Sequence, residues 1–379
     1  MEMTEKMPSG QIVRAGSSAG GGALALRSAT LVARGLRDLA RESNWLRVQI
    51  FSGKASKVAV SSVGTVCAIS AESRGTAPRV TVYDVHNSYA QMALAVPEET
   101  AALAKHLPAT LAWSPTGRFL AGTWAAWQPS IHLFDMGAKE FVGSFGRFKQ
   151  PPSYLAWSAN EHFIAAATPG GKLASLRLWM LGEQGESIED APAAHAGIPN
   201  WLERQTYEAE FGEEGAFGGY GRTTFSPDGK SLASVIEIHG EWADDSILIA
   251  EAPSLRKIQS FQAQGHITDL TWSGGGGSLI YCAAGQTYRL DRETLELELL
   301  PFAAELCTAH PQLPLAVCFS SWVKESARGQ LFAVDLTTGR VFDKCGADGV
   351  TELRWSQDRT KAYAISKDGT MCIYEPLAL

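Results

Sequence analysis

The segment Thr110–Phe145, TLAWSPTGRFLAGTWAAWQPSIHLFDMGAKEFVGSF, has the pattern of four short strands joined by turns. Its apolar residues form four stretches, and residues that favour turns lie between them, at Pro115 to Gly117, at Pro129 and at Gly137. Short apolar runs bounded by proline and glycine are typical of a strand meander. A single sheet of this kind cannot bury both of its faces, so copies of it must stack.

The turn between the first two of these strands recurs along the chain. Seven such turns begin with an apolar residue followed by serine or, in one place, by His310-Pro311. The turns lie at positions 61, 114, 158, 226, 273, 311 and 356. This spacing is near the ~40–45 residues of a four-stranded propeller blade. The sequence therefore predicts an all-β fold, a seven-bladed β-propeller of four-stranded antiparallel blades. The expected blades cover residues 57–96, 110–145, 153–181, 222–262, 265–302, 305–344 and 350 onward.

Three features of this pattern resemble the WD-repeat β-propeller family. They are Ser226-Pro227-Asp228-Gly229 between two strands, an acid that ends the third strand, as at Asp135, and Gly265-His266 ahead of a strand. The resemblance covers roughly residue 44 to the C-terminus, and it departs from the family pattern because Gly265-His266 is the only Gly-His pair. It implies a protein that assembles other proteins rather than a catalyst.

The seventh blade has only three strands of its own, between Val350 and Pro376. The strand-like stretch Trp45–Phe51 has no blade ahead of it. We therefore expect it to supply the outer strand of blade seven, because this closes the ring and covers both free edges.

Residues 1–43 lie outside the expected propeller domain, 44–379. Pro8–Gly22 is rich in glycine and serine and is expected to be flexible. Ala23–Glu42 has leucines on one side of a helical projection and arginines on the other, so it is expected to be an amphipathic helix. It could dock on the propeller or remain free, bind a partner, or act as an organelle transit peptide.

Composition limits the partners and the compartment. A net charge of −7 argues against nucleic acid or an anionic membrane as the main partner. No apolar run is long enough to span a membrane. The six cysteines are scattered without a C-x-x-C pair, which favours buried free thiols in a reducing compartment. We expect a cytoplasmic protein, with organelle import through the arginine-rich N-terminus as the alternative.

An acidic insertion interrupts the repeats at residues 182–221. It holds nine acidic residues against one arginine, and it carries Trp201, Tyr207 and Phe211 among its aromatic residues. Either 205–211 or 186–191 should form the outer strand of blade three. The insertion is either a solvated loop or a docking surface for a basic partner.

The connections between second and third strands are longer in blades two, four and six than in blades three, five and seven. They carry Trp124 and Trp127, then Trp242, and then Trp322. Equivalent loops of a propeller emerge on the same face, so these side chains should surround one end of the channel. Exposed tryptophan is enriched in binding hot spots, whereas the alternative is that each ring packs under its own loop.

Catalytic motifs are missing from the sequence. We find no phosphate-binding loop, no H-E-x-x-H and no G-x-S-x-G. The run Gly274–Gly277 links two strands and is expected to be a hairpin turn, and Asp244-Asp245 are expected to be solvated loop acids. We therefore expect no catalytic, cofactor-binding or metal-binding residues and a non-enzymatic interaction scaffold. The alternatives are a subunit of a large complex tethered by the N-terminal helix, and a propeller enzyme or small-ligand or cation binder with acids at the channel mouth.

Overall fold

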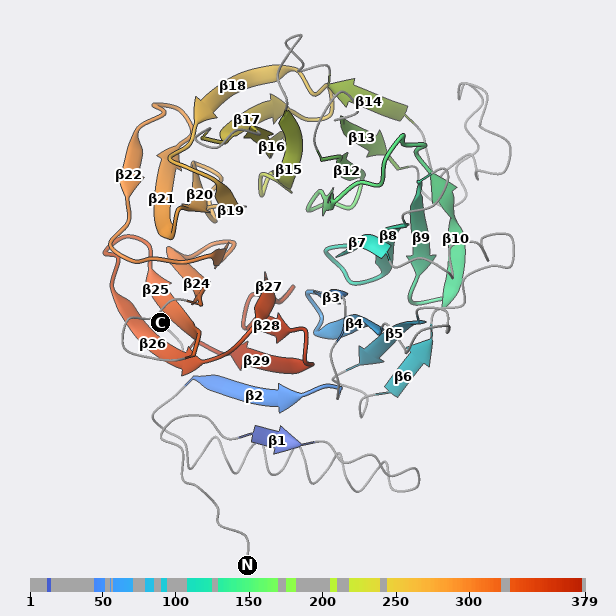
Figure 1. Ribbon diagram of the computed structural model, residues 1–379, viewed down its shortest axis with the longest axis horizontal. Coiled ribbons are helices and arrows are strands. Elements are labelled where there is room, and N and C mark those ends of the chain that lie inside the picture. Colours follow the sequence, from blue (N-terminus) through green and yellow to red (C-terminus); the bar gives the residue numbers. More distant parts are fainter. Residues whose placement is uncertain are drawn as a thin grey trace, which may run out of the picture.

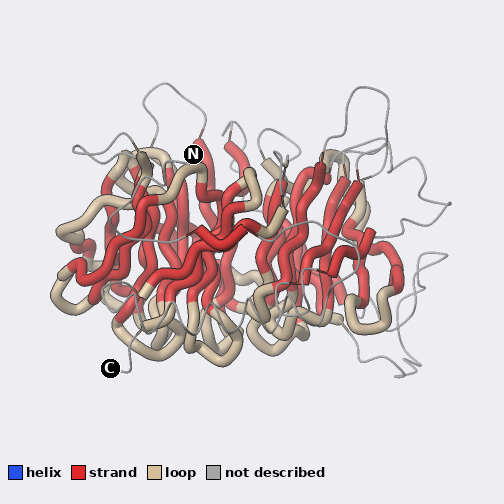
Figure 2. The backbone as a smooth tube through the Cα atoms, turned by 90° about the horizontal axis from the view of Figure 1, so that it is seen from below, coloured by secondary structure: helices blue, strands red, loops and turns tan. Residues whose placement is uncertain are grey.

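The computed structural model arranges the strands as sheets around a central axis (Figure 1). Seen from the side, the strands lie between two layers of loops, one at each end of the ring (Figure 2). The structure describes residues 12–14, 44–51, 55, 57–70, 79–84, 90–93, 108–124, 129–169, 175–181, 205–209, 218–238, 244–321 and 328–376.

Each blade is an antiparallel meander in which the first strand is innermost. Blade one consists of β3 (Lys57–Val60), β4 (Thr65–Ser70), β5 (Arg79–Asp84) and β6 (Ala90–Ala93), and blade two of β7 (Pro108–Trp113), β8 (Phe119–Trp124), β9 (Ile131–Asp135) and β10 (Glu140–Phe145). Blade three consists of β11 (Tyr154–Trp157), β12 (Phe163–Ala167), β13 (Leu176–Met180) and β14 (Gln205–Ala209), and blade four of β15 (Gly218–Phe225), β16 (Ser231–Ile238), β17 (Ser246–Glu251) and β18 (Lys257–Gln262). Blade five consists of β19 (Ile267–Trp272), β20 (Ser278–Ala283), β21 (Gln286–Asp291) and β22 (Leu297–Leu299), and blade six of β23 (Leu306–Ala309), β24 (Leu315–Ser320), β25 (Gln330–Asp335) and β26 (Val341–Gly346). Blade seven contains β27 (Val350–Trp355), β28 (Ala362–Ser366) and β29 (Thr370–Tyr374), to which β2 (Trp45–Gln49) and β1 (Ile12–Arg14) are added.

The prediction of seven four-stranded blades is wrong in one respect. Six sheets are four-stranded antiparallel blades, and the remaining sheet has five strands in the order β1-β2-β29-β28-β27. The fifth strand is present because β1 pairs in parallel with β2, within the segment expected to be flexible.

The closing strand lies where the sequence predicts it. β2 pairs antiparallel with β29, with Trp45 opposite Tyr374 and Gln49 opposite Thr370. The innermost strands contact one another in turn around the ring, and β27 contacts β3 to complete it. An apolar cluster fills each of the seven spaces between neighbouring sheets. The core is therefore distributed between the blades, so each blade buries its apolar faces against its neighbours.

The outer strand of blade three comes from the insertion. Of the two expected alternatives, the structure selects the first, since β14 pairs with β13 in antiparallel register. No described residue belongs to a helix, and the expected helix at 23–42 lies outside the described residues. Within the part of the chain that is described, no helix has the length and apolarity needed to cross a membrane.

The recurring serine closes the turn between the first and second strands. Its Oγ accepts a hydrogen bond from the backbone N–H of the residue five positions later, at distances of 2.9–3.1 Å. In blade six His310 takes this position, and its Nδ1 accepts hydrogen bonds from Gln312 N and Leu313 N. The donors are Phe119 to Ser114, Phe163 to Ser158, Ser231 to Ser226, Ser278 to Ser273 and Lys361 to Ser356.

The tryptophan before the serine fastens its blade to the preceding one. In four blades its Nε1 donates a hydrogen bond of 3.1–3.3 Å to a carbonyl on the innermost strand of the previous blade. The pairs are Trp113 with Ala59, Trp157 with Ala112, Trp272 with Thr224 and Trp355 with Thr308. One position of the repeat thus fills the core and satisfies a backbone acceptor of the neighbouring sheet.

The acid at the end of the third strand holds the next turn. Asp135 Oδ1 accepts hydrogen bonds from Gly137 N at 2.9 Å and Ala138 N at 3.0 Å. These backbone donors and the Arg118 guanidinium together hold the pKa of Asp135 below its ordinary value, although partial burial opposes them. Asp291 and Asp335 bind the backbone in the same way.

Candidate functional site: the central channel

Innermost strands from around the ring line a cavity of about 520 Å³ at the propeller axis. Threonine and serine hydroxyls form part of its wall, contributed by several blades. Among the described residues of its wall, the charged side chains are four basic residues and one carboxylate, in a chain whose net charge is −7. These five are Lys57, Arg222, Arg354, Lys367 and Glu352.

Two lysines lie together at one end of this cavity. Lys57 is the first residue of β3 and is exposed, and Lys367 directly follows β28. A backbone hydrogen bond of 2.7 Å from Ala55 N to Lys367 O holds the two segments together. Burial lowers the pKa of Lys57, and the charge of Lys367 lowers it further. The two ammonium groups therefore repel each other at the channel mouth.

Glu352 and Arg354 fasten the last blade to the first. They are two positions apart on β27, so their side chains lie on the same face of blade seven. Glu352 Oε2 accepts a hydrogen bond of 3.0 Å from Val60 N, while Arg354 donates to Val60 O at 3.4 Å and to Trp113 O at 3.2 Å. Burial raises the pKa of Glu352 to about 7, although Arg354 opposes the shift. Burial also lowers the pKa of Arg354.

Asp269 and Arg222 form a second charged pair on neighbouring innermost strands. Arg222 Nη1 lies 2.8 Å from Asp269 Oδ1, and the aspartate is almost fully buried. Asp269 Oδ2 also accepts a hydrogen bond of 2.8 Å from Cys307 N in blade six. Burial raises the pKa of Asp269, against the opposing effect of Arg222.

These two carboxylates stand at junctions where the repeating tryptophan is missing. The residue at the tryptophan position of the repeat is Val60 in blade one and Ala309 in blade six. At both junctions a carboxylate on the preceding innermost strand instead accepts a backbone N–H of the next one. At the third junction without tryptophan, Phe225 stacks on Phe163 with ring centroids 6.5 Å apart. Glu352 and Asp269 therefore have a structural role, because each attaches one blade to the next. The contacts described for Lys57 and Lys367 give these lysines no such role.

The carboxylates near the axis do not form a cation site. Among the described residues, no group of three or more His, Cys, Asp or Glu side chains could hold a metal ion. Glu352 does line the channel, as the cation-binding alternative required, but Arg354 lies beside it, and Asp269 is paired with Arg222.

The expectation for Asp245 is wrong, because it is buried and not solvated. Its Oδ2 accepts a hydrogen bond of 2.7 Å from Ile267 N and lies 2.9 Å from His266 Nδ1. The single Gly-His pair of the chain thus contacts an aspartate in the connection between β16 and β17.

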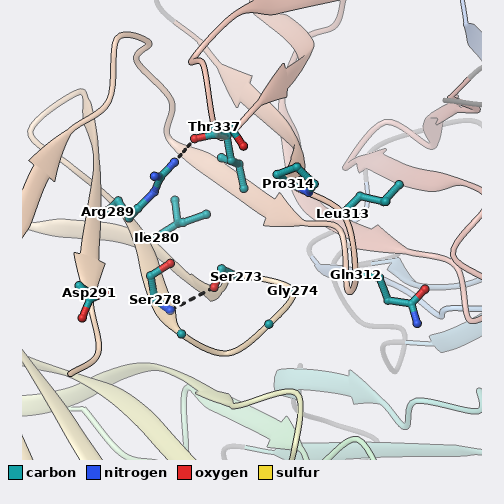
Figure 3. A pocket seen from close by; sticks show the side chains of 13 residues that line it. Ser273, Gly274, Ser278, Ile280, Arg289, Asp291, Gln312, Leu313, Pro314 and Thr337 are labelled. Atoms are coloured by element: carbon teal, nitrogen blue, oxygen red, sulfur yellow. Dashed lines mark hydrogen bonds between the residues drawn. The ribbon is translucent and has the colours of Figure 1, made fainter. Parts of the chain in front are cut away.

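A second cavity, of about 490 Å³, lies between blades five and six beside the glycine run (Figure 3). The run is the hairpin turn that the sequence predicts, closed by a hydrogen bond of 2.8 Å from Gly276 N to Ser273 O. Arg289 lies at the cavity wall (Figure 3) and donates a hydrogen bond to Leu336 O. Its Nη1 also lies 3.2 Å from Glu298 Oε2. Asp291 Oδ1 accepts hydrogen bonds from the backbone N–H groups of Glu293 and Thr294 in its own turn. The charged groups of this wall are therefore already paired within the chain.

The predicted docking residues are not tested by the structure. Trp127, Trp242, Trp322, Trp201 and Phe211 lie outside the described residues. Trp124 is the last residue of β8 and Tyr207 lies in β14, and only their backbone is described.

The connections that carry the tryptophans follow β8, β16 and β24, each the second strand of its blade. The connection after β28, which contains Lys367, is the equivalent one in blade seven. The lysine end of the channel and the tryptophan connections therefore belong to the same face of the propeller.

Sequence reasoning missed the charged residues of the channel. One signal was available, since Glu352 and Arg354 lie two positions apart in a first strand. Lys57 and Lys367 carry no such signal, because they are 310 positions apart and meet only through ring closure.

Comparisons with known proteins identify the fold. No family model matches the chain, and no curated protein matches it. Among solved structures, 1474 chains match, so the fold is too widespread to specify a function. A chain from a crystal structure of the mitotic checkpoint complex is 12% identical with a TM-score of 0.57, covering 88% of this chain and 95% of that one. The Swd1 β-propeller domain of Myceliophteria thermophila is 15% identical with a TM-score of 0.56, covering 87% of this chain and 100% of that one. The β-propeller expected from the resemblance to WD-repeat proteins is thus confirmed as the fold.

Proposed function

We propose that this protein is a non-enzymatic scaffold on which partner proteins dock. The docking surface is the propeller face from which the connections after β8, β16 and β24 leave. Trp124, Trp127, Trp242 and Trp322 supply its apolar contacts. The observation that carries the proposal is the shared origin of these connections, each at the end of a second strand.

The architecture supports this role. Hydrogen bonds from Trp113, Trp157, Trp272 and Trp355 and the carboxylates at two further junctions fasten blade to blade. A ring fastened in this way presents its loops at fixed positions, which lowers the ordering cost of binding. The structural likeness to a chain of the mitotic checkpoint complex, itself a multiprotein assembly, agrees with such a role.

The test is partner capture from native extract with the full chain, measured by quantitative mass spectrometry. We expect that replacing the four tryptophans by serine removes specific partners while the chain stays folded. The matched control is serine at Ile258, Leu299 and Phe342, which are exposed apolar residues on outer strands. If both variants retain the same partners as the parent chain, the proposed docking face is wrong.

The acidic insertion is a second candidate surface, on the rim of blade three. β14 places its residues 205–209 at the outer edge of that sheet, away from the axis. Its acidic residues, with Trp201, Tyr207 and Phe211, would select a basic partner. Replacing its glutamates by glutamine should then weaken capture of basic proteins and should make the remaining capture less sensitive to salt.

Two further proposals concern the location of the protein in the cell and its assembly into a complex. Five cysteines are buried free thiols, which supports a reducing, cytoplasmic location rather than an oxidising one. If the chain is instead a subunit tethered through residues 1–43, deletion of these residues should abolish assembly while the propeller stays folded.

A further inference from the structure

The channel end with Lys57 and Lys367 concentrates positive charge that the described chain does not balance. Among the described residues, no carboxylate forms an ion pair with either ammonium group. Arg222 and Arg354 differ from them, because Asp269 and Glu352 lie beside these two. Lys57 and Lys367 are thus the basic side chains of the cavity whose charge is available to a ligand.

The shape of the cavity fits a small ligand. A volume of about 520 Å³ lies within the range of small-molecule sites in proteins, roughly 300–1,000 Å³. Its wall comes from the innermost strands, so the site lies inside the ring of blades. A site enclosed by the blades favours a compact molecule over a folded protein surface.

The polar lining matches an oxyanion. Hydroxyl groups of Ser153 and of threonines from β7, β15, β23 and β27 line the cavity together with the basic residues. Hydroxyl and ammonium groups donate hydrogen bonds to phosphate or carboxylate oxygens. Glu352 is the only carboxylate of the lining, and burial raises its pKa to about 7, so near neutrality a large fraction of it carries no charge.

We propose that the lysine end of the central channel binds a small multivalent oxyanion, bearing phosphate or carboxylate groups. Lys57 and Lys367 make the direct charge contacts, and the hydroxyl lining accommodates the remaining oxygens. Arg222 and Arg354 add positive potential from deeper in the channel. This proposal goes beyond partner docking, because its ligand is a free small molecule and its residues are not the tryptophans.

The test is calorimetric titration of the full chain with inorganic tripolyphosphate and, separately, with citrate, at low salt. We expect saturable binding of at least one probe at one site per chain, and the preferred probe tells phosphate from carboxylate chemistry. In the double variant Lys57→Gln, Lys367→Gln, we expect binding about tenfold weaker or more, since two charges next to the ligand are lost. Added salt should weaken binding to the parent chain.

The matched control is the double variant Lys257→Gln, Lys344→Gln. Both lysines are exposed on outer strands, so it removes the same charge far from the axis. It should bind the probes as the parent chain does. The proposal is overturned if neither probe binds saturably at millimolar concentration, or if both double variants lose affinity equally. Urea unfolding of each variant shows whether a loss of binding reflects a loss of folded protein.

Discussion

Replacing Glu352 by glutamine should stabilise this protein at pH 8 and stabilise it much less at pH 5. The carboxyl group lies among the innermost strands and accepts a hydrogen bond of 3.0 Å from Val60 N. Burial raises its pKa from the ordinary value of 4.5 to about 7, despite the nearby Arg354. Glutamine retains the acceptor oxygen but cannot carry the charge, so it resembles the protonated acid at every pH.

The sign follows from proton binding. A carboxyl group with a raised pKa in the folded state binds its proton more tightly there than in the unfolded chain. The free energy of unfolding is therefore highest below the unfolded pKa of about 4.5, and this contribution is lost as the pH rises through about 7. The two pKa values correspond to a difference of about 3 kcal/mol at full effect. Because the channel admits water, we expect about 1–3 kcal/mol.

The assay is urea unfolding of the parent chain and the Glu352→Gln variant at pH 5, 6, 7 and 8. The advantage of the variant should grow from about pH 4.5 to about pH 7 and level off above that. An exposed residue, Glu296, provides the control, because Glu296→Gln makes the same chemical change away from the buried carboxyl group. A variant that is less stable than the parent at pH 8 would refute the reasoning. It would mean that the carboxylate stabilises the fold through Arg354 more than its desolvation costs.

Three further predictions test the fastening of the blades. Trp113→Phe should lower the free energy of unfolding by about 1–3 kcal/mol in urea titrations, because the buried Ala59 carbonyl loses its donor. Gly274→Ala should reduce the melting temperature, because the added Cβ would lie 2.5 Å from a backbone oxygen of blade six. Gly275→Ala is the control and should be neutral, because its Cβ would meet nothing within 4 Å. A chain beginning after Gly53 lacks β2, so light scattering should show aggregation through the exposed edge of β29.

The fold could be predicted because two of the repeated residues, the serine and the acid, make local contacts. The serine of each turn closes it with a neighbour five positions away, as Ser114 does with Phe119. The acid of the third strand binds the following turn, as Asp135 does with Gly137 and Ala138. Such contacts leave a periodic trace in the sequence, and the period sets the number of sheets. The closing strand followed from counting, since blade seven lacked an outer strand and Trp45–Phe51 had no other partner.

The channel could not be predicted, because its contacts join distant positions. Lys57 meets Lys367 only when the ring closes, and Arg222 meets Asp269 only when blade four packs on blade five. Asp245 was misjudged for the same reason. The sequence shows a pair of acids in a loop, whereas the first strand of the next blade buries one of them through Ile267.

The departures from the repeat are what give the channel its chemistry. Where tryptophan is missing from the repeat, at Val60 and Ala309, a neutral indole donor is replaced by a carboxylate acceptor on the preceding strand. This exchange preserves the attachment of one blade to the next, but it places Glu352 and Asp269 near the axis, where charge is costly without compensation. Arginines beside both carboxylates reduce that cost, and Lys57 and Lys367 make the channel basic. Because Glu352 titrates near neutral pH, the group that holds the ring closed also sets how positive the channel is, and its ionisation both lowers the stability of the ring and makes the channel less positive.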